Sequence, residues 1–206
     1  GQYHYRSGST KQELKGSALS KFLLDKVGVR WCNVPVPDIA PGDLDAKSIQ
    51  DFKESGIRKK RMDAEVLTDT TEDFLSSLDM IVDGQITRAG ILMFHPKPEK
   101  RFPGSFIKIG FFRSDSDLAF QDEIHGSLVQ QVDRTFDLLT TKYMNYLITY
   151  QGLQRVETPP FPEDPLRECI LNAVAHKDYQ DQVPIQISVY PDRIVFWNPG
   201  QLPESW

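Results

Sequence analysis

Three polar side chains that could carry out chemistry recur at intervals of four residues near the end of the chain: Glu168, Asn172 and His176. Residues four apart in an α-helix share one face, each a turn above the last. A carboxylate and an amide so placed can hold a hydrated Mg²⁺ and position a water at a phosphate, because Mg²⁺ keeps several waters and takes few protein oxygens. The same spacing also fits a solvated helix face, so both interpretations stay open.

The residues around this triad predict the helix that would carry it. Asp164 is a suitable N-cap, and Pro165 suits the first helical position. An apolar stripe recurs at helical spacing and would face a core. Its members are Leu166, Ile170, Ala173 and Val174.

A β-hairpin is predicted directly after this helix. Residues 184–190 alternate apolar and polar side chains, which is typical of a half-buried strand. Pro191-Asp192 indicates a turn, and residues 193–197 form a second β-rich run. Asn198-Pro199-Gly200 then breaks the strand.

Two runs in this region resemble a known family. The runs are Arg167-Glu168-Cys169-Ile170-Leu171-Asn172-Ala173-Val174-Ala175-His176-Lys177-Asp178-Tyr179, and Asp192-Arg193 followed by Asn198-Pro199-Gly200-Gln201-Leu202-Pro203. They resemble the nucleotide pocket of the GHKL ATPases, which include gyrase, heat-shock chaperone, mismatch-repair and histidine-kinase types. They are most similar to a divergent branch found in bacterial transcriptional regulators, which often carries the label of a RecG-related ATP-dependent DNA helicase.

The resemblance implies roles for particular residues. Glu168 would be catalytic and orient the attacking water, and Asn172 would bind Mg²⁺ and phosphate oxygens. His176 belongs to the same signature and is a further expected contact to the cofactor. Asn198 stands where active relatives keep an Asp that bonds adenine, and Gly200 is the following loop glycine. The implied cofactors are ATP and Mg²⁺, bound in the full-length protein.

Two departures from the family pattern keep other functions open. Asn198 accepts a hydrogen bond without the charge of an Asp. Leu202 replaces a second glycine, which makes the loop less permissive. A degenerate scaffold for interaction or dimerisation, which binds no nucleotide, is therefore the alternative. A helicase motor is disfavoured, because no Gly-x-x-x-x-Gly-Lys-Ser/Thr loop occurs in the sequence.

The predicted fold class is α+β, with mixed helices and short sheets. Residues 1–30 resemble the C-terminal edge of a Schlafen-AlbA nucleic-acid-binding domain, in which Arg6, Lys11 and Lys15 are candidate phosphate contacts. Residues 31–104 are expected to form a helical linker module with a wing-like hairpin. Residues 105–206 would form the first part of a GHKL-type sandwich that stops before the second glycine-rich box.

Within the linker module, Asp83-Gly84 between apolar pairs predicts a tight hairpin. Residues 46–54 are predicted to form a helix with Asp45 as its candidate cap and Gly56 closing it, and residues 71–78 a second helix capped by Thr70 or Thr71. These two helices and the hairpin outline a winged helix, yet residues 71–78 lack the basic side chains of a recognition helix. Arg58-Lys59-Lys60-Arg61 is the only dense basic run, and it fits either a nucleic-acid contact or a solvated loop. Further along, an apolar stripe predicts one long helix over residues 127–150. Its expected members are Leu128, Val132, Phe136, Leu139, Tyr143, Tyr146 and Leu147.

Composition limits the function classes. The chain has 206 residues and a net charge of −5, which argues against broad nucleic-acid binding. No apolar run approaches the roughly 20 residues that span a bilayer. Two isolated cysteines and no visible signal peptide favour a cytoplasmic protein. The start at Gly-Gln suggests a piece of a longer protein, with DNA bound through other domains and a homo-oligomer expected.

Overall fold

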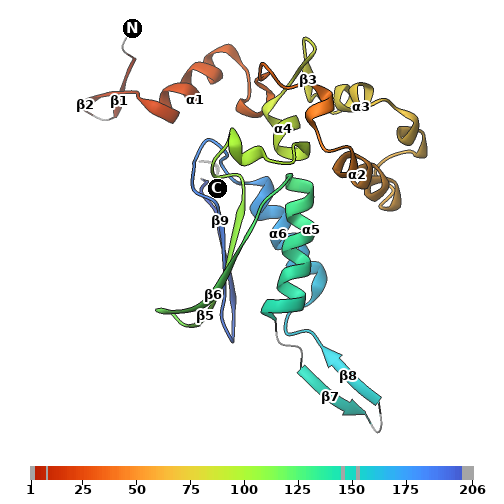
Figure 1. Cartoon of the computed structure of the whole chain (residues 1–206). Coiled ribbons are helices and arrows are strands. Elements are labelled where there is room, and N and C mark those ends of the chain that lie inside the picture. Colours follow the sequence, from red (N-terminus) through yellow and green to blue (C-terminus); the bar gives the residue numbers. More distant parts are fainter. Residues whose placement is uncertain (1–2, 8, 145–146, 152–153, 201–206) are drawn as a thin grey trace. The chain divides into compact units, whose positions relative to one another are not determined.

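A computed structural model describes residues 3–7, 9–144, 147–151 and 154–200. The chain divides into two compact units, one ending at Phe94 and one beginning at His95. Figure 1 shows helices and small sheets in both units, so the expectation of a mixed α+β fold is confirmed. No helix within the described ranges is long and apolar enough to cross a membrane.

The first unit starts with a hairpin and a helix. The hairpin pairs β1 (His4–Ser7) with β2 (Thr10–Glu13), and helix α1 (Gly16–Val27) follows. Gly28 ends α1 in the left-handed conformation, with φ of 70°. A glycine adopts that conformation without the penalty that a side chain brings.

The rest of the first unit consists of α2 (Ala46–Arg58), α3 (Thr71–Ser77), a hairpin and α4 (Arg88–Phe94). The expected caps are confirmed for both helices, because Asp45 accepts from the Lys47 amide at 3.1 Å and Thr70 accepts from the Asp73 amide at 3.1 Å. The core is aromatic, with Phe74 and Phe94 fully buried and rings 5.6–6.3 Å apart. The rings that meet there are Phe52, Phe74 and Phe94.

The pairing of β3 (Ile81–Val82) with β4 (Gln85–Ile86) confirms the expected tight hairpin. Asp83 and Gly84 have φ of 51° and 75°, the left-handed pair that a tight primed turn requires. Pro35 forms an isolated antiparallel bridge with Thr87, the residue that follows β4.

One helix boundary was predicted wrongly in this unit. Gly56 was expected to close α2, but the helix continues to Arg58. A Cβ at Gly56 would lie 2.6 Å from the Met62 sulfur, so this glycine allows a close approach inside the helix. Tertiary contact with the following loop therefore outweighs the usual role of a glycine as a stop.

The second unit is built on a four-stranded sheet ordered β10-β9-β5-β6. Strands β5 (Ile107–Ser114) and β9 (Ile185–Val189) pair in parallel, and their register places Ile107 beside Ile185. Strands β6 (Asp117–Ile124) and β10 (Ile194–Trp197) are the antiparallel edges. One face of the sheet carries fully buried isoleucines, and Figure 1 shows α5 and α6 beside each other on one side of it.

The long helix expected over residues 127–150 is not formed. Helix α5 (Leu128–Leu138) passes into a π-helical turn (Leu139–Tyr143), and β7 (Leu147–Gln151) then pairs with β8 (Gln154–Thr158). The run Leu-Ile-Thr-Tyr at 147–150 favours a strand through its β-branched and aromatic side chains. The helical spacing of apolar residues in α5 therefore does not indicate a helix in this run.

The buried stripe of α5 also differs from the expected one. Gln131 and Thr135 are fully buried, whereas Val132 and Phe136 are only half-buried. Gln131 Nε2 donates to the carbonyls of Ser105 at 2.8 Å and Gly126 at 2.7 Å. Because these bonds satisfy loop carbonyls that would otherwise be buried alone, a polar residue takes the place of an apolar one.

Candidate functional site

The candidate site lies on helix α6 (Glu163–Ala175) and the chain that follows it. The helix starts after Pro162, so the prediction of Asp164 as its N-cap was wrong. Asp164 and Pro165 lie within the first turn, where an acidic side chain suits the helix dipole and a missing N–H costs little. The apolar stripe is confirmed, since its members are buried: Leu166, Ile170, Ala173 and Val174.

Glu168 and Asn172 lie together on the exposed face of α6. Asn172 Nδ2 donates to Glu168 Oε1 at 3.1 Å, so the two side chains are joined one turn apart. This bond orients the Glu168 carboxylate. It leaves the amide oxygen of Asn172 as the atom that can ligate a cation or accept a hydrogen bond.

The corner from Asn198 to Gly200 is fastened to the end of α6. Asn198 Nδ2 donates to the Ala173 carbonyl at 3.3 Å, and Pro199 is buried. The Pro199 carbonyl accepts from the Asp178 amide at 2.8 Å. The last carbonyls of a helix have no hydrogen-bond donor within the helix. The Asn198 side chain donates a hydrogen bond to one of these carbonyls, that of Ala173. The structure thus brings Asn198 to the helix that carries Glu168 and Asn172.

His176 is the C-cap of α6 and its side chain is exposed. Its backbone makes the contacts in this region, because its amide donates to the Asn172 carbonyl at 3.0 Å and its own carbonyl faces Gly200. A Cβ on Gly200 would lie 3.0 Å from that carbonyl oxygen. Close approach of two backbones therefore explains the glycine.

Two residues of the signature that had no assigned role hold the loop after α6. Lys177 is buried, and its Nζ donates to the carbonyls of Asp178 at 3.1 Å and Asp181 at 3.3 Å. Burial lowers the pKa of the Lys177 ammonium, and the charges of Asp181 and Asp178 oppose that shift. Tyr179 donates its hydroxyl to the Val174 carbonyl at 2.9 Å, and burial raises its pKa.

Arg167 fixes α6 against α5. Its guanidinium lies 4.3 Å from the centre of the Phe136 ring and 3.0 Å from Asp133 Oδ1. Since Arg167 precedes Glu168, this contact sets the rotation of the helix and so the direction of its polar face. Arg167 is part of the run that resembles the family signature, but the sequence alone assigned it no role.

The three candidate phosphate contacts lie in the first unit, away from α6 in sequence. Arg6 and Lys11 are exposed and directly opposite each other in the β1–β2 ladder. Like charges so placed repel unless an anion lies between them. Lys15 instead pairs with Glu13 at 2.8 Å. The structure therefore groups Arg6 with Lys11 and gives Lys15 a carboxylate partner of its own.

Comparison with known proteins supports the fold alone. No family model matches the sequence, and no curated protein matches it. Among solved structures, the chain resembles the crystal structure of the DIP2311 protein from Corynebacterium diphtheriae, with a TM-score of 0.64 and 17% sequence identity. The match covers 98% of this chain and 39% of that one, so the chain spans well under half of that protein's length.

Proposed function

We propose that the polar face of α6 and the Asn198–Gly200 corner form part of an ATP·Mg²⁺ site in a bacterial transcriptional regulator with a divergent GHKL-type domain. The observation that carries this proposal is the Asn172–Glu168 hydrogen bond of 3.1 Å on the exposed side of a helix whose other side is buried. A surface helix gains little from such a pair. Its chemistry suits a hydrated cation beside a polyphosphate.

Each member of the site has one task in this proposal. The amide oxygen of Asn172 would hold Mg²⁺, whose charge would offset that of the phosphates. Glu168, held by the Asn172 amide, accepts a hydrogen bond from water at the terminal phosphate. Hydrolysis in the whole protein would depend on that carboxylate.

Asn198 would select the base. Its Nδ2 is already bonded to the Ala173 carbonyl, so Oδ1 is the atom that remains to contact a ligand. An acceptor at this position suits the exocyclic amine of adenine. The O6 of guanine is also an acceptor, so guanine would bind more weakly there.

The experiment is a calorimetric titration of the full-length protein with a non-hydrolysable ATP analogue, with and without Mg²⁺. We expect the wild type to bind the analogue only when Mg²⁺ is present. In Asn172→Ala, the affinity for the analogue should no longer depend on Mg²⁺. Gln50→Ala is the matched control, because Gln50 Nε2 donates to Glu54 Oε1 at 2.8 Å in the same spacing on α2. No binding by the wild type would reject the site, and unchanged Mg²⁺ dependence in Asn172→Ala would reject the metal ligand.

A second candidate function is an interaction scaffold without nucleotide, and the open face of the sheet favours it. Phe112 stacks on Tyr190 with ring centres 5.3 Å apart. Leu118, Val195 and Trp197 are 44%, 44% and 48% exposed. Exposed apolar groups on neighbouring strands are typical of an interface. A homo-oligomer would cover this face, and sedimentation of the full-length protein with and without Val195→Glu tests that arrangement.

A further inference from the structure

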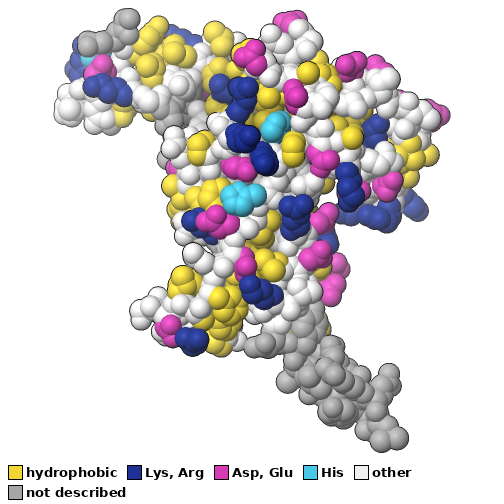
Figure 2. Space-filling view, in the orientation of Figure 1, with side chains coloured by type: hydrophobic (Ala, Val, Ile, Leu, Met, Phe, Trp, Pro, Cys, Tyr) yellow, Lys and Arg dark blue, Asp and Glu magenta, His cyan; other side chains and the backbone are white. Residues whose placement is uncertain are grey.

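Four consecutive cations at the end of α2 have no partner among the described residues. Arg58, Lys59, Lys60 and Arg61 are all exposed, and none makes an ion pair or a side-chain hydrogen bond there. Other cations are paired, such as Lys47 with Asp51 at 3.2 Å. Figure 2 shows acidic and basic side chains interspersed over one face of the molecule. An unpaired run of this density is therefore an exception in an acidic chain.

The backbone holds this run in a defined shape. The amides of Lys60 and Arg61 donate to the carbonyls of Ile57 and Gly56, both at 2.8 Å. Lys60 has a φ of 54°, a left-handed conformation that is uncommon outside glycine. The helix dipole favours cations in the last turn and so accounts for Arg58 and Lys59. It does not account for Lys60 and Arg61, which lie beyond the helix end.

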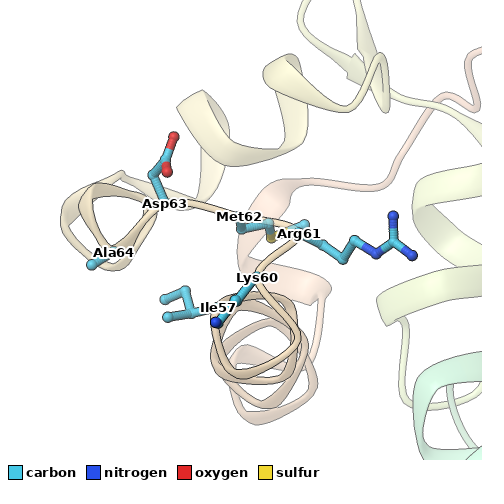
Figure 3. A pocket seen from close by; sticks show the side chains of 6 residues that line it. All are labelled: Ile57, Lys60, Arg61, Met62, Asp63 and Ala64. Carbon is cyan, nitrogen blue, oxygen red and sulfur yellow. The ribbon is translucent and has the colours of Figure 1, made fainter.

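A hollow adjoins the run. Its volume is about 320 Å³, at the low end of ligand pockets. Three apolar side chains form part of its lining: Ile57, Met62 and Ala64. The charged lining residues are Lys60, Arg61 and Asp63, and Figure 3 shows the guanidinium of Arg61 directed away from Ile57 and Ala64. The hollow therefore has apolar walls and two cationic residues in its lining, of which Arg61 directs its charge outward.

We propose that the Arg58–Arg61 run and this hollow bind single-stranded nucleic acid, with phosphates on the cations and one unstacked base in the hollow. Bases of a duplex are stacked and cannot enter such a space, whereas single strands expose them. Duplex binding by a winged helix would place α3 in the major groove as the recognition helix. Helix α3 carries Glu72 and Asp73 in its first turn, and these carboxylates repel phosphate. Binding is local and sensitive to salt, because the chain as a whole is acidic.

The first test is fluorescence anisotropy of the full-length protein with labelled oligothymidylate at several salt concentrations. We expect the triple variant Lys59→Ala, Lys60→Ala, Arg61→Ala to bind at least tenfold more weakly. Each phosphate contact on a single strand contributes about −0.7 to the slope of log K against log salt, so the slope should lose about 2. The matched control removes three exposed charges elsewhere, as Lys97→Ala, Lys100→Ala and Arg101→Ala.

Several results would overturn this part of the proposal. Equal weakening by both triple variants would mean diffuse attraction. Tighter binding of a duplex of the same length would mean that the run does not prefer single-stranded nucleic acid. Absence of binding to the oligomer, combined with binding to phosphatidylserine vesicles that the first triple variant abolishes, would assign the run to a membrane surface.

The second test separates the hollow from the charges. Ala64→Phe fills the hollow without changing charge, so affinity should fall several-fold while the salt slope stays constant. An oligomer with abasic sites should bind the wild type and Ala64→Phe equally, because it has no base to insert. Circular dichroism verifies folding of the variant. Unchanged affinity of Ala64→Phe for the intact oligomer would overturn the base contact.

Discussion

Replacing Asn198 with Asp would place a carboxylate beside the Ala173 carbonyl, and we expect this change to destabilise the protein. Asn198 Nδ2 donates to the Ala173 carbonyl at 3.3 Å. A carboxylate in its place puts an acceptor against an acceptor.

The size of the effect follows from the lost bond. Leaving a buried acceptor without its donor costs about 1–3 kcal/mol, and we expect about 1–2 kcal/mol here because Asn198 is half-buried. In a chain of this length each kcal/mol shifts the melting temperature by about 2–4 °C, so Tm should fall by roughly 2–8 °C at pH 7.

The stability of Asn198→Asp relative to the wild type should depend on pH. The carbonyl contact disfavours the charged form of an Asp at this position, so its folded pKa should rise above the unfolded value of about 3.9. A protonated carboxyl can donate to the carbonyl again. The folded state then binds more protons than the unfolded state, and the deficit in stability should shrink as pH falls through the raised pKa.

The assay is a set of thermal melts followed by circular dichroism between pH 4 and pH 8, on the wild type, Asn198→Asp and Asn198→Ala. Asn198→Ala removes the donor without adding charge, so the difference between the two variants measures the repulsion. If Asn198→Asp is as stable as the wild type at pH 7, with no separate pH dependence, the proposed role of Asn198 as an anchor to α6 is refuted.

Three further predictions concern the same unit. Gly200→Ala should cost about 1 kcal/mol through contact with the His176 carbonyl, measured by urea unfolding. Tyr143→Phe should cost about 1–3 kcal/mol of folding free energy. Lys142 and Tyr143 hold the pKa of Asp122 low, so the wild type loses stability as Asp122 is protonated at acid pH, and this loss should be smaller in Tyr143→Phe. Lys177→Met should destabilise at pH 7 by orphaning two carbonyls, and should abolish a rise in stability toward alkaline pH that follows from the lowered lysine pKa.

Local chemistry made several elements predictable. The caps at Asp45 and Thr70 satisfy amides within a few residues, and the Asp83-Gly84 turn depends on its own backbone angles. Alternation also located β9, because one face of that strand packs on a core. These features need no knowledge of distant segments.

The misjudged elements depended on distant segments. Gly56 stays inside α2 because Met62 folds back onto it. Gln131 is buried because two loop carbonyls need its amide. The helix expected over residues 127–150 ended early because its last part pairs as a strand with residues further along. Periodicity alone does not register such partners.

The sequence by itself determined which chemical groups are available: the spacing of Glu168 and Asn172, the apolar stripe behind them and the run of cations after α2. Only the tertiary structure decided how these groups are used. It bonded Asn198 to Ala173, buried Lys177 on two loop carbonyls and placed β5 beside β9 across a long stretch of chain. The physical reason is that propensity and spacing act within a few residues, whereas burial of polar groups requires partners that only the folded chain brings close.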